Sequence, residues 1–235
     1  MAQAGWRTAW LNDAQDARRL LWRGVEAQHR VATMRLVDTL AEQDLLEQLL
    51  EAGKPPLPPA AQSQHYLLST PFRYAPPWPS RFRRSDHPGA WYGADNVLTV
   101  AAELAHWRWR FLMDAADLSQ ASLLTEHTFF QARFVGRELD LCAAPWSRLR
   151  ATWRHTDDYV PCHALADAAR AHAPPIDAIR YESARREGGL CQAVFAPATL
   201  SLPSPRRQQN WACKTTRERV FFVHESDSIE FPMAG

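Results

Sequence analysis

Residues 54–64, KPPLPPAAQSQ, divide the chain into a shorter and a longer part. Proline locks its own φ angle and donates no backbone hydrogen bond, so this segment continues neither a helix nor the interior of a sheet. We therefore expect residues 1–53 to form a helical N-terminal segment, joined by this connector to a catalytic domain over residues 65–235. With 235 residues, 46% of them hydrophobic, the chain is long enough to bury one substantial core.

The segment from Asn12 to Ala52 is predicted to be helical, with Asn12 and Gln15 as its N-terminal capping pair. Thr39 and Glu42 form a second capping-box pattern, so we expect a hairpin of two helices that ends at Gly53. Apolar side chains recur at helical spacing at Val25, Ala32, Leu36 and Leu40, and again at Leu45, Leu46, Leu49 and Leu50. This second stripe is expected by default to pack on the core of the same chain, with a homodimer contact as the alternative.

Beyond the connector, short apolar runs alternate with helical patterns. Strands are predicted at residues 65–74, 177–181, 190–195 and 219–224, and a pair of strands at 128–142 turning near Gly136. Helices are predicted at residues 96–112 and 160–171. This mixture indicates an α/β or α+β core, with a mixed sheet flanked by helices.

Charge and cysteine usage exclude several classes of function. Lys and Arg number 27 against 26 Asp and Glu, so the net charge of +1 gives no general argument for a nucleic-acid or membrane partner. The basic and aromatic residues 106–110, HWRWR, lie on a predicted helix, where the two tryptophans point to different faces. The four cysteines have no chelating spacing, and His155, Cys162 and His163 match no common zinc pattern, so no metal is expected. The chain shows neither a signal peptide nor an apolar run of about 18 residues, which predicts a cytoplasmic protein.

The most informative stretch is residues 71–111, where chemistry-bearing side chains are separated by turn-forming prolines and a glycine. Glu103 lies in the middle of the predicted helix 96–112, with Val100 and Trp107 on the same face. A carboxylate on an apolar face needs a positive or hydrogen-bonding partner. Either a structural bridge to a residue such as Arg110 or a cationic substrate meets that need.

Three ordered motifs resemble the RES domain, which is named for its Arg, Glu and Ser. The first motif carries the arginines, in Phe72-Arg73-Tyr74 and Ser80-Arg81-Phe82-Arg83. The second consists of residues 88–94, PGAWYGA, and 99–103, TVAAE, in which Tyr92 precedes Glu103 by eleven positions. The third is residues 179–185, IRYESAR, followed by 188–190, GGL. Together they cover the chain from about residue 66 to 224.

The resemblance implies a fold similar to that of ADP-ribosyltransferases and an activity that degrades NAD⁺. The family's reactions are phosphorolysis with inorganic phosphate, hydrolysis, or transfer of ADP-ribose to a target. It also implies a toxin of a toxin–antitoxin pair, whose partner is an antitoxin with an Xre-like helix-turn-helix domain and is a further candidate to bind the N-terminal helices. Many members have asparagine where this chain has Arg83, which leaves open whether Arg73 or Arg81 is the essential arginine.

The residue chemistry fits this reaction. Arg73 or Arg81 suits a pyrophosphate, because guanidinium groups bind phosphate bidentately. Glu103 can stabilise positive charge that develops on the ribose. Tyr92, with Tyr74 or Trp91, can stack on the nicotinamide ring, and Ser183 can hydrogen-bond the carboxamide or a ribose hydroxyl. Arg185, in the third motif, is a further candidate NAD⁺-binding residue.

Two other functions remain open at this point. A mono-ADP-ribosyltransferase would use the same residues on a protein acceptor, and a catalytically inert binding module would use its Arg and Glu as a stabilising bridge.

Overall fold

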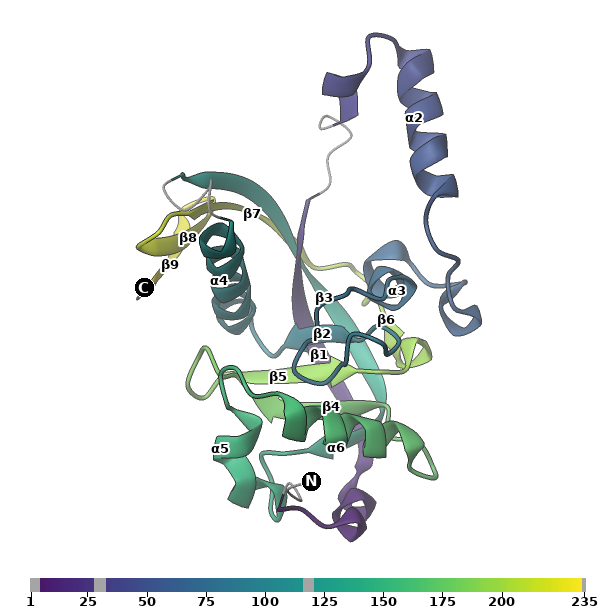
Figure 1. Cartoon of the computed structure of the whole chain (residues 1–235), viewed down its shortest axis with the longest axis vertical. Coiled ribbons are helices and arrows are strands. Elements are labelled where there is room, and N and C mark those ends of the chain that lie inside the picture. Colours follow the sequence, from purple (N-terminus) through teal and green to yellow (C-terminus); the bar gives the residue numbers. More distant parts are fainter. Residues whose placement is uncertain (1–4, 28–32, 116–120, 234–235) are drawn as a thin grey trace.

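The computed structural model of the protein describes residues 5–27, 33–115 and 121–233 (Figure 1). Over these residues the strands form one sheet of nine strands, in the order β1-β2-β5-β4-β3-β7-β8-β9, with β6 paired to β3. The strands are β1 Gln15–Glu26, β2 Trp91–Ala94, β3 Leu123–Asp140, β4 Ala178–Glu182, β5 Leu190–Val194, β6 Leu200–Ser201, β7 Gln208–Thr215, β8 Arg219–His224 and β9 Asp227–Pro232. The α-helices are α2 Leu40–Ala52, α3 Tyr66–Arg73, α4 Val97–Asp114, α5 Arg150–Trp153 and α6 Val160–Ala171.

The long strand β3 organises the sheet. One of its edges pairs with β1 along twelve positions, and the other pairs with β7 in its first half and with β4 at its end. The β3–β4 pairing is parallel, whereas the other strand pairs are antiparallel. Because β1 also pairs with β2, the strands β1, β2, β5, β4 and β3 close into a ring. The predicted mixed sheet flanked by helices is therefore confirmed.

The prediction of a helix from Asn12 to Ala52 is wrong over residues 15–26, which form strand β1. Gln15 begins this strand, so it does not cap a helix with Asn12. Every residue of β1 pairs with β3, from Gln15 opposite Glu138 to Glu26 opposite His127. Pairing with a strand more than a hundred residues away outweighs local helix propensity here. Residues 28–32, which the same prediction included, lie outside the described residues.

Two more predicted elements differ from the structure. Residues 66–73 form helix α3 instead of a strand, with Pro71 inside the helix. Residues 123–140 form the single strand β3 instead of two strands turning at Gly136. A Cβ atom at Gly136 would lie 2.8 Å from Oδ2 of Asp177. Glycine is therefore needed at this position for close packing and not for a turn.

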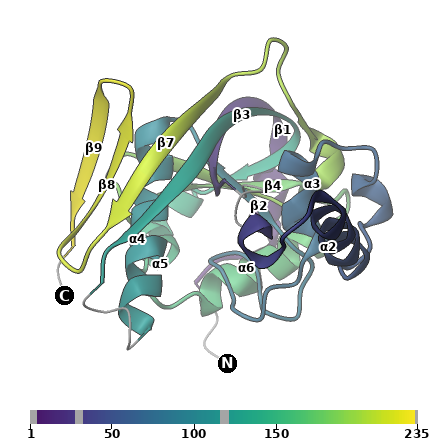
Figure 2. The ribbon, with the colours of Figure 1, turned by 90° about the horizontal axis from the view of Figure 1, so that it is seen from above.

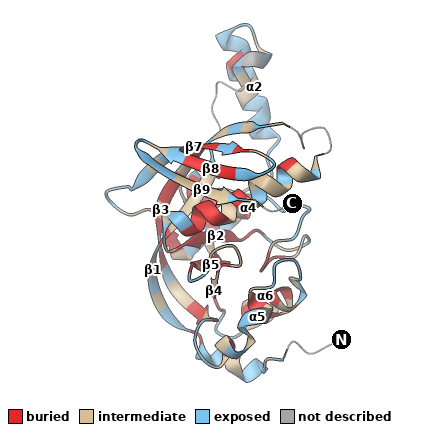
Figure 3. Ribbon diagram, turned by 90° about the vertical axis from the view of Figure 1, so that its left-hand side faces the viewer, coloured by how far each residue is buried: buried red, intermediate tan, exposed pale blue. Residues whose placement is uncertain are grey.

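Other predictions are confirmed. Helix α2 begins with the predicted capping box, in which the Thr39 side chain accepts from the Glu42 backbone, and it ends at Gly53. Helices α4 and α6 and strands β4, β5 and β8 occupy the predicted segments. However, Leu45 and Leu49 of α2 are 55% and 62% exposed, so the default expectation that this stripe packs on the core is wrong. Figures 1 and 3 show α2 extending away from the sheet.

The two faces of the sheet carry separate hydrophobic clusters. Helices α4 and α6 cover one face with residues such as Ala101 and Leu165, and Figure 2 shows α4 lying against β7 and β8. Helix α3 covers the other face, where Leu68 and Phe72 pack beside the fully buried Trp91. Among the described residues, no helix combines the length and the apolar character needed to cross a membrane.

His127 of β3 makes folding stability depend on pH. Burial and, to a smaller extent, the nearby cation of Arg108 together lower the pKa of His127 from 6.5 to about 4. Below about pH 6.5 the unfolded chain binds a proton that the folded protein excludes, so the free energy of unfolding falls as the pH is lowered. We expect protonation of His127 to lower the free energy of unfolding by about 2 kcal/mol when the pH falls from about 7.5 to 5.

Urea denaturation at both pH values measures this effect. Between these pH values the free energy of unfolding of the His127→Gln variant should fall by about 2 kcal/mol less than that of the wild type. Equal losses in the two proteins would contradict the assignment.

Candidate active site

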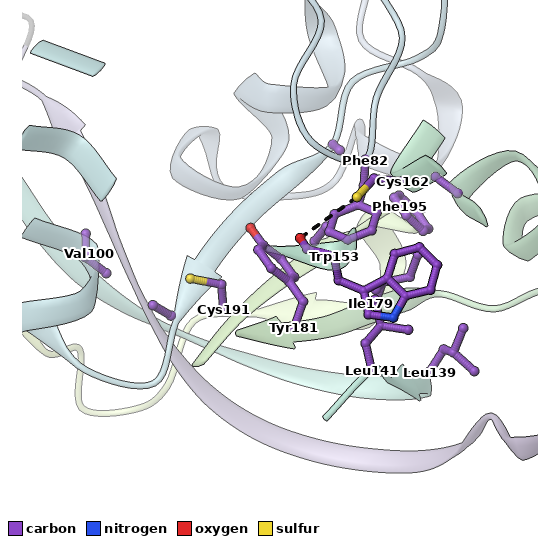
Figure 4. Packing of buried hydrophobic residues seen from close by; sticks show 14 of the residues in the cluster. Phe82, Val100, Leu139, Leu141, Trp153, Cys162, Ile179, Tyr181, Cys191 and Phe195 are labelled. Carbon is purple, nitrogen blue, oxygen red and sulfur yellow. Dashed lines mark hydrogen bonds between the residues drawn. The ribbon is translucent and has the colours of Figure 1, made fainter. Parts of the chain in front are cut away.

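A cavity of about 260 Å³ lies between α4, β1, β2, the loop at Ser80 and Arg81, and Tyr159 at the start of α6. Its inner wall includes Tyr181 and Cys191, which Figure 4 shows beside the core residues Phe82 and Val100. At Gly24 of β1, a Cβ atom would lie 2.5 Å from Cδ1 of Leu104 on α4. The absence of a side chain at this position lets the helix approach the strand, and the two form one wall of the cavity.

Glu103 projects into this cavity from α4. Asn96 caps the helix by accepting from the Thr99 backbone at 2.9 Å, which fixes where the helix starts and therefore which face Glu103 occupies. The Ser183 hydroxyl donates to Oε1 of Glu103 at 2.5 Å, and the Cys191 thiol lies 4.0 Å from the same oxygen. No hydrogen bond from a described residue reaches the second carboxylate oxygen.

The alternative reading of Glu103, a structural bridge to Arg110, is wrong. Arg110 lies 3.8 Å from carboxylate oxygens of Asp114 and Asp157. Within the described residues, Glu103 forms no ion pair, and its neighbours are the neutral hydroxyl and thiol. An unpaired carboxylate facing a cavity is suited to a cationic ligand group.

Ser183 orients Glu103 by a hydrogen bond from outside the cavity lining. Its side chain is completely buried and accepts from the backbone N–H groups of Arg185 and Arg186 at 3.0 and 3.1 Å. The O–H of the same side chain donates to Glu103, so the hydroxyl links the loop after β4 to α4. Ser183 does not line the cavity in the structure, and its position supports Glu103.

We expect Ser183→Ala to lower the unfolding free energy by about 1–3 kcal/mol, because two part-buried backbone N–H groups lose their acceptor and Glu103 loses its donor. It should also lower the activity assigned below, since Glu103 loses its orienting partner. Thermal denaturation and steady-state kinetics measure the two effects. A variant with normal stability and normal activity would contradict this role.

Tyr92 lines the cavity from β2, and its hydroxyl anchors the neighbouring loop. That hydroxyl lies 2.8 Å from Oγ of Ser80 and accepts from the Phe82 backbone at 3.1 Å. Burial raises the pKa of Tyr92, so the phenol stays neutral. Neighbouring side chains of a strand point to opposite faces, which places Tyr92 at the cavity and buries Trp91 behind it.

Arg81 and Arg185 also line the cavity. The buried Arg81 guanidinium donates to the carbonyl oxygens of Trp153 and His155 at 2.8 and 2.7 Å, and it lies 4.8 Å from the Tyr159 ring. Arg185 donates to the Thr156 carbonyl at 3.0 Å. Neither arginine is ion-paired within the described part of the chain, so both cations remain available to an anionic ligand.

Arg23 of β1 is a site residue that the sequence reasoning missed. Its guanidinium donates to the Tyr92 carbonyl at 2.7 Å and lies 5.5 Å from the Trp91 ring, while its Nε has no hydrogen-bond partner among the residues that the structure describes. Burial lowers the pKa of Arg23 to about 10, which keeps it charged at neutral pH. Leu21, Arg23 and Val25 alternate along one face of the strand, a pattern that the helical prediction concealed.

Three residues predicted for this site lie elsewhere. Arg73 ends helix α3 and pairs with Glu51 of α2 at 2.9 Å, because residues 66–73 are a helix and not the predicted strand. Tyr74 lines a separate cavity. Trp91 is completely buried in the cluster on the opposite face of the sheet, so its ring is not open to a ligand.

Arg83, the position at which many RES domains have asparagine, does not line the cavity. Its guanidinium donates to the carbonyl oxygens of Pro76, Trp78 and Arg84, and so holds the loop that carries Arg81.

Comparisons with known proteins give a family match and a likeness to solved structures. The model of the family described as "RES domain" matches residues 56–216. No curated protein matches the sequence. The crystal structure of the MbcT–MbcA toxin–antitoxin complex from M. tuberculosis is similar with a TM-score of 0.49 and 13% sequence identity, over 89% of this chain and 92% of that chain.

Proposed function

The chain belongs to the RES-domain family, and on that premise we propose that it cleaves NAD⁺ at the bond between nicotinamide and ribose. The observation that carries the proposal is the composition of the cavity. One unpaired carboxylate, Glu103, faces a space that three arginines line without ion pairs among the described residues: Arg23, Arg81 and Arg185. NAD⁺ has the matching pattern of charge, because a diphosphate lies beside a cationic nicotinamide riboside.

The reaction needs charge stabilisation more than proton transfer. The bond from ribose C1″ to the nicotinamide nitrogen breaks, its electron pair leaves with nicotinamide, and the ring becomes neutral. Positive charge then develops on the ribose, where the Glu103 carboxylate stabilises it. An acceptor oxygen bonds to C1″ and releases its proton. Ser183 holds the carboxylate in place through the 2.5 Å hydrogen bond.

The remaining groups orient the substrate. Tyr92 and Tyr159 place aromatic rings at the cavity, which suits a flat nicotinamide ring. The arginines bind the phosphates by charge-assisted hydrogen bonds. The acceptor is inorganic phosphate or water, giving the 1″-phosphate of ADP-ribose or free ADP-ribose. ADP-ribose retained on a protein would instead indicate a mono-ADP-ribosyltransferase.

In the cell this reaction makes the protein a toxin, because loss of NAD⁺ stops growth. Its partner in this proposal is an antitoxin with an Xre-like helix-turn-helix domain, as the family resemblance implies. The exposed leucines of α2 leave a homodimer contact as a further prediction.

Expression in a bacterial host tests the proposal as a whole. The intact chain should arrest growth and lower the NAD⁺ pool, while Glu103→Ala, expressed to the same level, should do neither. If the two proteins behave identically, NAD⁺ cleavage is not the activity of this chain.

A further inference from the structure

A second cavity, of about 670 Å³, lies between α3, β1, β3 and β7. Arg23 lines both cavities and, among the described residues, is the single one that they share. The second cavity has no part in the cleavage chemistry described above, and its walls differ from those of the first. They include the exposed rings of Tyr66 and Tyr74 and the polar side chains of Thr128 and Asn210.

We propose that this second cavity binds the adenosine half of the dinucleotide, with its diphosphate at Arg23 between the two cavities. This inference rests on the proposed function for the identity of the whole substrate. The binding of an adenine nucleotide in the second cavity can be tested without it.

The backbone explains how the two cavities meet. One edge of β1 pairs with β3 along its whole length, while the other edge pairs with β2 at Trp22 and Ala94 alone among the described residues. From Arg23 onward this edge is therefore open. The Arg23 side chain spans the opening and donates to the Tyr92 carbonyl on β2. This arrangement of two cavities with a cation between them suits a substrate with two nucleoside halves and a central diphosphate.

The walls of the second cavity suit a purine nucleoside. Tyr66 and Tyr74, 67% and 37% exposed, offer aromatic faces to a base, and Leu67 and Val25 add apolar surface. Thr128 donates to Oδ1 of Asn210 at 3.2 Å, which fixes the orientation of an amide that can bond to an adenine edge. Glu26 is held by Arg108 at 2.8 Å, so its negative charge is neutralised and does not repel the phosphates.

Two variants test the subsite directly. Thr70 lines the cavity on the exposed surface of α3, so Thr70→Trp fills the space, and Tyr66→Ala removes an aromatic face. Trp78→Ala is the matched control, because this exposed aromatic side chain lines neither cavity. Circular dichroism of each variant establishes that it is folded.

The first readout is AMP binding by isothermal titration calorimetry. We expect wild type and Trp78→Ala to bind AMP alike. Tyr66→Ala should bind it about tenfold more weakly, the loss of one base–aromatic contact, and Thr70→Trp at least as weakly, because the indole occupies the space of the base. The second readout compares NAD⁺ with nicotinamide mononucleotide, which lacks the adenosine. Thr70→Trp should lower kcat/KM for NAD⁺ about tenfold more than for the mononucleotide.

The outcomes separate this inference from the proposed function. If wild type does not bind AMP, or if the cavity variants bind it as the control does, the subsite is overturned. The subsite is also overturned if Thr70→Trp lowers kcat/KM equally for NAD⁺ and for nicotinamide mononucleotide. If no substrate is cleaved but AMP binding weakens in the cavity variants as expected, the subsite stands and the proposed reaction falls.

Discussion

Replacing Glu103 by glutamine should lower kcat for nicotinamide release about 10²–10³-fold, the usual effect of removing one electrostatic stabiliser of a transition state. Glutamine has the same shape, and its amide oxygen can still accept from Ser183, so the variant should remain folded. The lost charge acts mainly in the transition state, where the ribose becomes positive, and KM should therefore change little.

Asp114→Asn is the matched control for Glu103→Gln. It removes a carboxylate from the exposed end of the same helix, outside the cavity, and should keep wild-type kinetics. A Glu103→Gln enzyme with normal kcat would show that the carboxylate is not part of the chemistry.

The second large effect is expected at Arg23. Arg23→Gln should lower kcat/KM for NAD⁺ about 10²-fold, because the diphosphate loses charge-assisted hydrogen bonds while the donor to the Tyr92 carbonyl can be kept. Arg23→Lys should recover part of the loss, since it restores the charge without the bidentate geometry. Steady-state kinetics over a range of NAD⁺ concentrations measure both variants.

Arg73→Gln separates the structural assignment from the sequence motif. Arg73 pairs with Glu51 away from the cavity, so its replacement should leave NAD⁺ kinetics unchanged. A large loss of kcat/KM in the Arg73 variant, with none in the Arg23 variants, would contradict the assignment of Arg23. It would indicate that Arg73 binds the diphosphate.

The predicted residues that the structure brings together at the cavity depend on local sequence signals. Glu103 is placed by a helix whose cap, apolar face and length are all encoded between residues 96 and 114. The family motifs bring Tyr92 and Ser183 into consideration by their order, and the structure connects Glu103 to Ser183 by a hydrogen bond across 80 residues of sequence. That contact has no local signature, because it depends on how α4 packs beside the loop after β4.

The parts that the sequence does not predict depend on long-range pairing. Arg23 lies on β1, whose partner β3 is distant in sequence; the ion pair between Arg19 and Glu138 joins residues 119 positions apart. Apolar spacing alone supports a helix there, so the strand and its arginine are missed. The family motif is present at Arg73, but this arginine ends helix α3 and pairs with Glu51 of α2. The order of the motifs therefore identifies the family, and the fold shows which arginines line the cavity.

The most direct test of the central claim is to incubate the purified protein with NAD⁺ and separate the products by liquid chromatography. One free nicotinamide should appear for each NAD⁺ consumed, and the diphosphate should stay intact in ADP-ribose, its 1″-phosphate or an ADP-ribosylated acceptor. Unchanged NAD⁺, or cleavage at the diphosphate to AMP and nicotinamide mononucleotide, would contradict the claim.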